Sequence, residues 1–536
     1  MRSRAQRAPR RFRPVADALD PRQLLASTVP LGINISVPEF VDAIKDTNGW
    51  GGAPVDDRGW PTTDASIVVF DDRVNMPWNG PDPNAAIPQV SGDYHLSFTG
   101  QAKVGAYGAD VQNQAYDPTT NTTTADVVVP SGGLFLQLFF SSTQRTPSDP
   151  VGSGVSDVHL IRPGYAPNTT QLFTNQYLAA LEPFAALRTM DATDTNDYGP
   201  EWVGQPLNWS QRHLPTDSGE GPGGDGRVAG ASWEDLIQLA NQTHTDLWIN
   251  IPGPATDNYI TGLANLLKYG DTVDGIFYPG LAPGLKVYVE WSNEVWGGLD
   301  STYNYAVWDV QQNLPILTDD GTPATDTWRT GPTILRDDLR HTVQIARDFN
   351  AVFHDPNHDT IRPVLSWQEG NTWAFPATFA WFQSNFGAPS QYLYGLGGNT
   401  YYSPSDYSSV DNLLASLRAA EQANNQGIRD TTALDAQYGL VNVSYEGGPG
   451  IDATGDAGQV GLAALRDPRM AQIVAQAYHD WYADGGGLAM FYSGPYGIWG
   501  PQWPWTAAEL GQASDPMASP KYAGLIEVLD SNQPTS

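Results

Sequence analysis

The chain has 536 residues, of which 40% are hydrophobic and 11% aromatic, so it can bury a sizeable core and is not intrinsically disordered. Its 28 basic and 59 acidic residues give a formal net charge of −31. This charge repels phosphates and so argues against nucleic acids and anionic membranes as partners. The absence of cysteine excludes disulfides, thiolate metal sites and cysteine nucleophiles. No apolar run approaches the roughly 20 residues that span a bilayer, so no membrane span is expected.

Residues 1–29 differ in character from the rest of the chain. Six arginines lie within the first 13 residues, before any acidic residue. The apolar core of a standard signal peptide does not follow them. Residues 19–25 nevertheless resemble the Leu-x-Pro-Arg-x-Leu-Leu segment near the start of many large extracellular bacterial proteins. The resemblance implies a secreted or cell-surface protein, and a disordered basic tail is the alternative.

A short apolar segment at residues 31–35 predicts a buried strand, followed by a helix over residues 40–45. From about residue 62 to 165 the pattern changes to an alternation of polar and apolar residues, which is typical of half-buried antiparallel strands. The predicted strands of this region are 66–70, 94–98, 103–107, 123–129, 134–140 and 155–161. Their spacing predicts a small β-sandwich.

Beyond about residue 170, short apolar strands alternate with helices, a pattern typical of a parallel sheet. The predicted strands are 187–190, 247–251, 286–292, 364–367, 394–396, 440–444 and 488–491. The predicted helices are 175–184, 233–242, 257–268, 334–349, 374–385, 410–425, 470–483 and 522–529. With residues 31–35 the strands number eight, which favours a (β/α)₈ TIM barrel over an open doubly wound sheet.

The predicted fold class is therefore α/β, a barrel with a β-sandwich domain inserted between its first and second units. The organisation that follows has four parts. They are a basic tail (1–29), the first barrel unit (30–61), the inserted β-sandwich (62–165) and the remainder of the barrel (166–536).

Two glutamates stand at the ends of predicted barrel strands. Glu294 follows the fourth strand and Glu446 follows the seventh, and these strand ends face each other across a barrel mouth. Retaining glycoside hydrolysis needs two carboxyl groups roughly 5–5.5 Å apart across the sugar, and facing strand ends can supply such a pair. Glu290 is the rival for Glu294, but we expect it to point into the barrel and pair with an arginine such as Arg188.

The strand ends resemble those of the clan-A glycoside hydrolases. Asn293-Glu294 matches the asparagine and acid/base glutamate at the end of strand four, and Glu446 matches the nucleophile at the end of strand seven. The resemblance implies that Asn293 holds the 2-hydroxyl of the sugar and that Arg188, at the end of strand two, supports the charge of Glu446.

At strands six and eight the resemblance is partial. The His-x-Tyr motif of many members reads Asn399-Thr400-Tyr401 here, so the tyrosine that contacts the nucleophile matches and the histidine does not. At strand eight, Tyr492 and Trp499 are both candidates for the aromatic sugar platform.

The predicted function is hydrolysis of an oligo- or polysaccharide with retention of configuration, by attack of Glu446 and proton donation from Glu294. This reaction needs no cofactor and no metal. A non-catalytic carbohydrate-binding or surface protein on the same barrel is the alternative from another class. Inversion is a further alternative, and it would require a carboxyl separation above ~6.5 Å. The inserted β-sandwich either extends the substrate cleft, binds polysaccharide or has a structural role.

Overall fold

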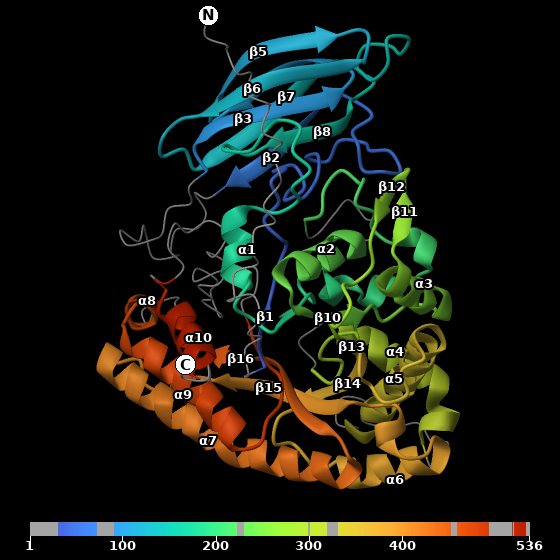
Figure 1. The fold of residues 1–536 in the computed structure, drawn as a ribbon, viewed down its shortest axis with the longest axis vertical. Helices are drawn as coiled ribbons and strands as arrows, with labels where there is room; N and C mark the ends of the chain where they lie inside the picture. Colours follow the sequence, from blue (N-terminus) through green and yellow to red (C-terminus); the bar gives the residue numbers. More distant parts are fainter. Residues whose placement is uncertain are drawn as a thin grey trace, which may run out of the picture.

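Eight parallel strands close into a barrel that is surrounded by helices in the lower part of Figure 1. The computed structural model describes residues 30–71, 90–221, 230–297, 301–318, 331–451, 458–492, 517 and 519–531. In chain order the barrel strands are β1 (Leu31–Asn34), β9 (Ala186–Arg188), β10 (Asp246–Ile251), β13 (Val287–Trp291), β14 (Ile361–Gln368), β15 (Gly395–Tyr402), β16 (Val441–Pro449) and β17 (Ala489–Phe491). Strand β17 pairs with β1 and closes the barrel. The predicted barrel is thus confirmed, and an open sheet is wrong.

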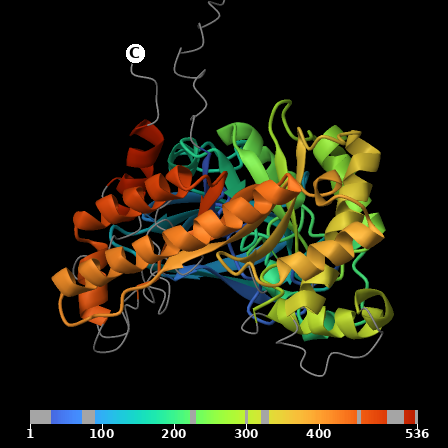
Figure 2. The same ribbon diagram turned by 90° about the horizontal axis from the view of Figure 1, so that it is seen from below.

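Helices lie between the barrel strands in the chain, and one more follows the last strand. They are α1 (Asn175–Leu181), α2 (Trp233–Thr243), α3 (Asp257–Tyr269), α4 (Ser301–Leu317), α5 (Gly331–Phe353), α6 (Phe375–Asn385), α7 (Val410–Tyr438), α8 (Gly458–Leu465), α9 (Arg469–Ala483) and α10 (Pro520–Ser531). Two of these, α4 and α8, had no counterpart in the predicted set. Helix α7 continues beyond its predicted end and is the long orange helix in the view from below (Figure 2). Among the described helices, none combines the length and apolar character needed to cross a membrane.

The helix predicted over residues 40–45 is wrong. Phe40 forms a β-bridge with Phe173, and Asp42 forms one with Ile161. The Asp42 carboxylate accepts hydrogen bonds from the backbone N–H groups of Ile44 and Leu160. An aspartate that binds nearby backbone in this way competes with helix formation, so the segment becomes a turn.

Hydrophobic side chains pack on both sides of the barrel strands because successive residues of a strand point to opposite faces. Inside the barrel the buried side chains include Trp248, Tyr288 and Tyr445. The outward residues, such as Val289 and Leu365, pack against the surrounding helices in one large core. Both layers hold the strand ends rigidly, which suits a site built from them.

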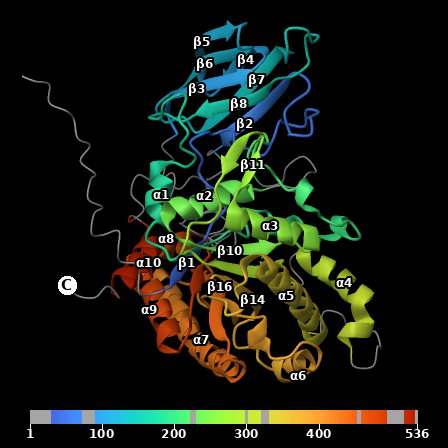
Figure 3. The ribbon, with the colours of Figure 1, turned by 45° about the vertical axis from the view of Figure 1, so that its right-hand side comes forward.

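Between β1 and α1 the chain forms two antiparallel sheets. One has the order β2 (Ala65–Asp71), β7 (Phe135–Gln144), β4 (Gln101–Tyr107). The other has the order β5 (Asp110–Asp117), β6 (Thr122–Val129), β3 (Gly92–Thr99), β8 (Ser156–Ile161). The two sheets share a hydrophobic core of their own, which includes Tyr94, Leu138 and Phe140. Figures 1 and 3 show them together at one end of the molecule, beyond the barrel.

Each of the six strands predicted for this region is present, whereas β5 was not predicted. The sequence of β5, DVQNQAYD, is mostly polar and exposed, so it lacks the apolar alternation by which strands are found. The interpretation of residues 62–165 as a separate inserted domain stays a prediction. A further hairpin, β11 (Asp271–Val273) and β12 (Ile276–Tyr278), lies between α3 and β13.

Candidate active site

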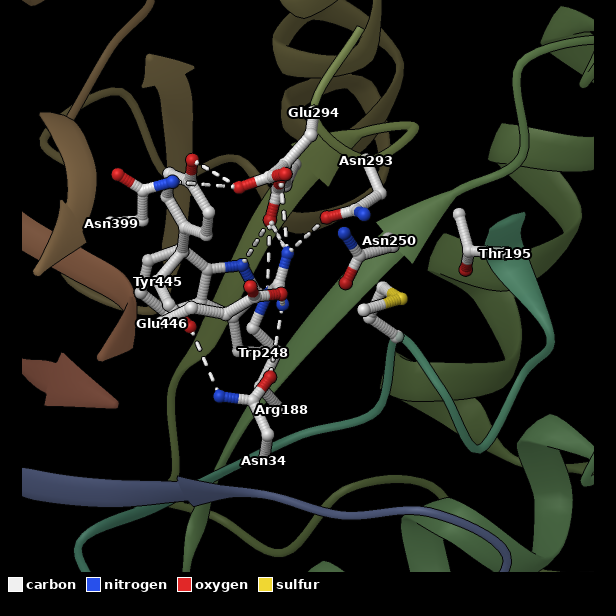
Figure 4. Close-up of polar contacts among 12 residues, drawn as sticks. Asn34, Arg188, Thr195, Trp248, Asn250, Asn293, Glu294, Asn399, Tyr445 and Glu446 are labelled. Carbon is white, nitrogen blue, oxygen red and sulfur yellow. Dashed lines mark hydrogen bonds and ion pairs between the residues drawn. The ribbon is translucent and has the colours of Figure 1, made fainter. Parts of the chain in front are cut away.

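Arg188, the last residue of β9, is the centre of a buried polar network at the strand ends (Figure 4). Its side chain is fully buried. One terminal nitrogen, Nη1, donates to Glu446 Oε1 at 2.6 Å and to Asn34 Oδ1 at 2.9 Å. The other, Nη2, donates to Glu290 Oε2 at 3.0 Å and to Asn293 Oδ1 at 2.8 Å. Burial opposes the charge of the guanidinium, but the two carboxylates overcome this and raise the pKa of Arg188.

Glu446 lies within β16 and is buried. Besides Arg188 it accepts a hydrogen bond from the hydroxyl of Tyr401, with 2.7 Å between that oxygen and Oε2. Burial is the largest effect on this carboxyl and raises its pKa above the usual range, while Arg188 and Tyr401 act in the opposite direction. Both oxygens of Glu446 are therefore held by donors that favour its ionised form.

Glu294 follows β13 and is partly exposed, in a left-handed backbone conformation with φ of 42°. Two donors reach its Oε1 atom: Asn399 Nδ2 at 3.0 Å and the Tyr445 hydroxyl at 2.9 Å. A register shift in the pairing of β15 with β16 lies between Gly398 and Asn399. Bulges of this kind redirect side chains, and here Asn399 meets Glu294 although the family resemblance would place a histidine there.

Glu290 points into the barrel and is buried beneath this site. Its carboxylate binds Arg188 and also accepts a hydrogen bond from Trp248 Nε1 at 2.9 Å. The predicted pairing of Glu290 with Arg188 is therefore present. Arg188 also forms an ion pair with Glu446, so one guanidinium contacts both glutamates. Its role in supporting the charge of a nucleophile stays a prediction.

The remaining predicted residues lie around the two glutamates. Asn293 is buried, and its Nδ2 atom donates to Asn196 Oδ1 at 3.0 Å. Tyr492 packs edge-on against Tyr401, with 6.1 Å between ring centroids. The other platform candidate, Trp499, lies outside the described residues. The roles assigned to Asn293 and Tyr492 in sugar binding stay predictions.

Four residues of the network were not predicted. Asn34 ends β1, Trp248 lies in β10, and Tyr445 directly precedes Glu446. Asp191 follows Arg188 by three residues, and burial, reinforced by the nearby charge of Glu446, raises its pKa to about 7. The rule that selects the two glutamates, which looks for polar residues at the ends of barrel strands, would also have selected Asn34 and Asp191.

One cluster of potential metal ligands occurs among the described residues. Ligand atoms of Asp309, Asp337 and His341 lie within 4.8 Å of one another. The guanidinium of Arg340 already bridges the two aspartates. Because this cation occupies the position between the carboxylates, the cluster does not fit a metal ion.

No known family model matches the sequence, and no curated protein sequence matches it. Several solved structures are similar. The GH51 arabinofuranosidase from Xanthomonas axonopodis pv. citri is 13% identical, with a TM-score of 0.37 over 61% of this chain and 62% of that chain. The α-L-arabinofuranosidase from Thermotoga maritima is 11% identical, with a TM-score of 0.34 over 59% and 58%. The GH5 xyloglucanase from Bacteroides ovatus is 10% identical, with a TM-score of 0.33 over 82% and 94%.

The aligned part of this chain spans about three fifths of the length of the two arabinofuranosidases. At such identities a similarity concerns the fold alone, and fold does not determine activity. The case for an activity therefore rests on the geometry of the strand ends. The chain is similar to glycoside hydrolases of several families, and no one family is assigned to it.

Proposed function

We propose that the protein is a retaining glycoside hydrolase that cleaves an oligo- or polysaccharide, with Glu446 as nucleophile and Glu294 as acid/base. The observation that carries this proposal is that two carboxyl groups of one network differ in their burial and in their hydrogen-bond donors. Glu446 is buried between Arg188 and Tyr401, whereas Glu294 is partly exposed and held by neutral donors. Pairs of carboxyls in contrasting environments are suited to separate roles in acid–base chemistry.

In the first step, ionised Glu446 attacks the anomeric carbon while the carboxylic acid of Glu294 gives its proton to the departing glycosidic oxygen. The positive charge of Arg188 and the hydroxyl of Tyr401 stabilise the carboxylate until it forms the ester bond. The sugar is then bound to Glu446 and the leaving group departs as an alcohol.

In the second step, the carboxylate of Glu294 takes a proton from water, and the resulting hydroxide attacks the same carbon and releases Glu446. Both displacements invert the configuration, so the product retains that of the substrate. Asn399 and Tyr445 donate to Glu294 Oε1, which suits this carboxylate stage.

The test uses nitrophenyl and dinitrophenyl glycosides of arabinofuranose, xylose, mannose and glucose. We expect Glu446→Gln to lose turnover of every substrate that the wild-type protein cleaves. Glu294→Gln should lose about 10²–10⁴-fold on nitrophenyl glycosides, as expected for loss of a general acid. It should form the glycosyl-enzyme at nearly the wild-type rate from dinitrophenyl glycosides, because that leaving group departs without a proton.

Glu290→Gln distinguishes the rival acid. If Glu290 only supports Arg188, its substitution lowers turnover of both kinds of substrate in the same proportion. Glu182→Gln, at an exposed position after α1, is the matched control and should have no effect. Azide should restore turnover of Glu446→Gly and give a glycosyl azide of inverted configuration.

Two outcomes would contradict the proposal. A product of inverted configuration from the wild-type protein, observed by NMR at the anomeric proton, would replace retention with inversion. Binding of sugars without turnover of any substrate, unchanged in Glu294→Gln and Glu446→Gln, would favour a non-catalytic carbohydrate-binding protein.

We further infer that residues 62–165 are an inserted β-sandwich domain, an inference supported by the two sheets and their separate core. The segment at residues 19–25 supports action outside the cell. Limited proteolysis tests the first inference, because a domain should survive as a resistant fragment. Fractionation of the source cells tests the second.

A further inference from the structure

The two sheets of the inserted region differ in their outer faces. The four-stranded sheet presents polar side chains to solvent, among them Asp93, His95, Ser97, Thr124 and Asp126. The three-stranded sheet exposes Val68, Tyr107 and Phe139, with 43%, 61% and 41% of their surface accessible. The solvent-exposed face of a sheet is normally polar, so the exposed apolar residues of the three-stranded sheet indicate a surface that binds something.

We call this surface the aromatic face and define it by Val68, Tyr107, Phe135 and Phe139. It arises because the side chains of β7 point alternately into the core and outward. Leu136, Leu138 and Phe140 point into the core, which leaves Phe135, Gln137 and Phe139 on the outer side. Strand β2 places Val68 opposite Gln137, and β4 places Tyr107 opposite the same residue from the other side. The rings of Tyr107 and Phe135 meet edge to face, with 5.3 Å between centroids.

Hydrogen-bonding side chains lie among the rings. Gln137 lies between Phe135 and Phe139 on β7, and its Nε2 atom donates to Ser66 Oγ at 3.2 Å. Opposite Phe139 stands Gly105, where an added Cβ atom would meet nothing within 4 Å. One amide and one hydroxyl thus lie among the exposed rings, and the outward row of β4 continues past Gly105 to the exposed Lys103 at the border of the face.

We propose that the aromatic face binds a neutral polysaccharide chain. The C–H surface of a sugar ring is apolar and packs on aromatic rings, and its hydroxyls form hydrogen bonds with amide and hydroxyl side chains. The net charge of −31 disfavours acidic polymers. The choice of this ligand rests on the proposed function, since a glycosidase with such a face would be held on its own substrate.

The apolar part of the face is small compared with a stable protein interface. The exposed parts of Val68, Tyr107 and Phe139 amount to roughly 300 Å² of side-chain surface, from typical side-chain areas. A stable protein interface buries about 800 Å² on each partner. A glycan chain needs only a few stacked rings, so it fits a patch of this size.

The experiment compares electrophoretic retardation in gels containing arabinoxylan, xyloglucan or galactomannan. We expect the wild-type protein to be retarded by at least one of these neutral polymers. The double variant Tyr107→Ala, Phe139→Ala should bind that polymer at least about tenfold more weakly than the wild type. The single variant Tyr107→Ala should show a smaller loss of binding. Phe277→Ala is the matched control, because Phe277 is 62% exposed but lies in the β11–β12 hairpin, and its binding should equal that of the wild type.

Turnover of aryl glycosides, measured in parallel, separates this inference from the proposed function. The double variant should keep the wild-type kcat/KM on these small substrates and lose rate only on the dilute polymer. Equal retardation of the double variant and the wild type would overturn the inference, since the glycan would then bind elsewhere. A wild-type dimer that the double variant converts to monomers, without polymer binding, would also overturn it and identify a self-association surface.

Discussion

At Glu446, two opposing influences act on one carboxyl group. Burial favours the neutral acid, while Arg188 and Tyr401 favour the carboxylate that a nucleophile needs. Arg188 divides its charge between Glu446 and Glu290, so it neutralises neither glutamate completely. The hydroxyl of Tyr401 therefore contributes appreciably to the ionisation of Glu446.

Tyr401→Phe should shift the pH dependence of the reaction. Loss of the hydrogen bond from Tyr401 raises the pKa of Glu446 further, so a larger share of Glu446 is protonated at acidic pH. We expect kcat/KM to fall about tenfold or more, as for loss of a hydrogen bond to a charged group. The acidic limb of the kcat/KM profile should move to higher pH, so the loss is larger at about pH 5 than at about pH 7.

Tyr402→Phe is the control for this prediction. Tyr402 is the next residue of β15, is buried in the core outside the barrel, and its hydroxyl has no hydrogen-bond partner among the described residues. Its removal should leave the pH profile unchanged. An acidic limb at the same pH in Tyr401→Phe and the wild type would show that Tyr401 does not set the ionisation of Glu446.

Strand β15 positions side chains because its glycines allow a close approach to β16. A Cβ atom on Gly397 would lie 2.0 Å from the carbonyl oxygen of Val443, which is backbone and cannot turn away. Beyond this contact the register shifts, and Asn399 and Tyr401 then meet Glu294 and Glu446. The spacing of these two strands thus determines the geometry at both carboxyls.

Gly397→Ala should therefore destabilise the barrel and misplace the site. We expect a loss of about 2 kcal/mol or more in the free energy of unfolding, as for an overpacked core, and a fall in kcat. Gly105→Ala in β4 is the control, because a Cβ there meets nothing within 4 Å, and its melting temperature should be close to that of the wild type. A wild-type melting temperature for Gly397→Ala would show that the strands can separate without cost.

The sequence predicts those elements whose side chains carry a periodic signal. Most of the barrel strands are short, largely buried apolar runs that alternate with helices, and this pattern predicts all eight; β15, GLGGNTYY, is the least apolar of them. The sequence does not predict strand β5, and it predicts a helix where residues 40–45 form a turn. In both places pairing with distant residues, rather than the local pattern, determines the structure. Likewise the strand-end rule selects Glu294 and Glu446, whose catalytic roles stay predictions, but the contact of Asn399 with Glu294 depends on a register shift that no sequence pattern reveals.

On the scale of the whole molecule, an ion cluster joins the segment before the two sheets to the barrel. Lys45 Nζ lies 2.5 Å from Glu220 Oε1 and 2.6 Å from Asp235 Oδ2, and both carboxyls are fully buried. Asp235 belongs to the first turn of α2, and Glu220 accepts a hydrogen bond from the backbone N–H of Ser232, the N-cap of that helix. One cation thus holds the region between β1 and β2 against a barrel helix.

Lys45→Met should leave two buried carboxyls without a cation, which costs about 3–5 kcal/mol for a broken buried ion pair. The loss should depend on pH with a definite sign. The charge of Lys45 lowers the pKa of Glu220, which burial already raises well above its usual range, so the variant raises that pKa further. When the pKa of a glutamate is raised in the folded state, the free energy of unfolding falls as the pH rises above the pKa of that group in the unfolded chain, about 4.3. The wild type shares this loss up to its own raised pKa, so the deficit of the variant grows only above that pKa and should be larger at about pH 8 than at about pH 5.

Melting temperatures across this pH range measure the effect, with Lys103→Met, at an exposed lysine in β4, as the control. Lys103→Met should follow the wild type at every pH because an exposed charge contributes little. A deficit of Lys45→Met that is the same at both ends of the range would mean that lost packing of the lysine chain, rather than unpaired carboxyls, destabilises the variant. A deficit that grows with pH would show that the region between β1 and β2, which leads into the two sheets, is held to the barrel by charge.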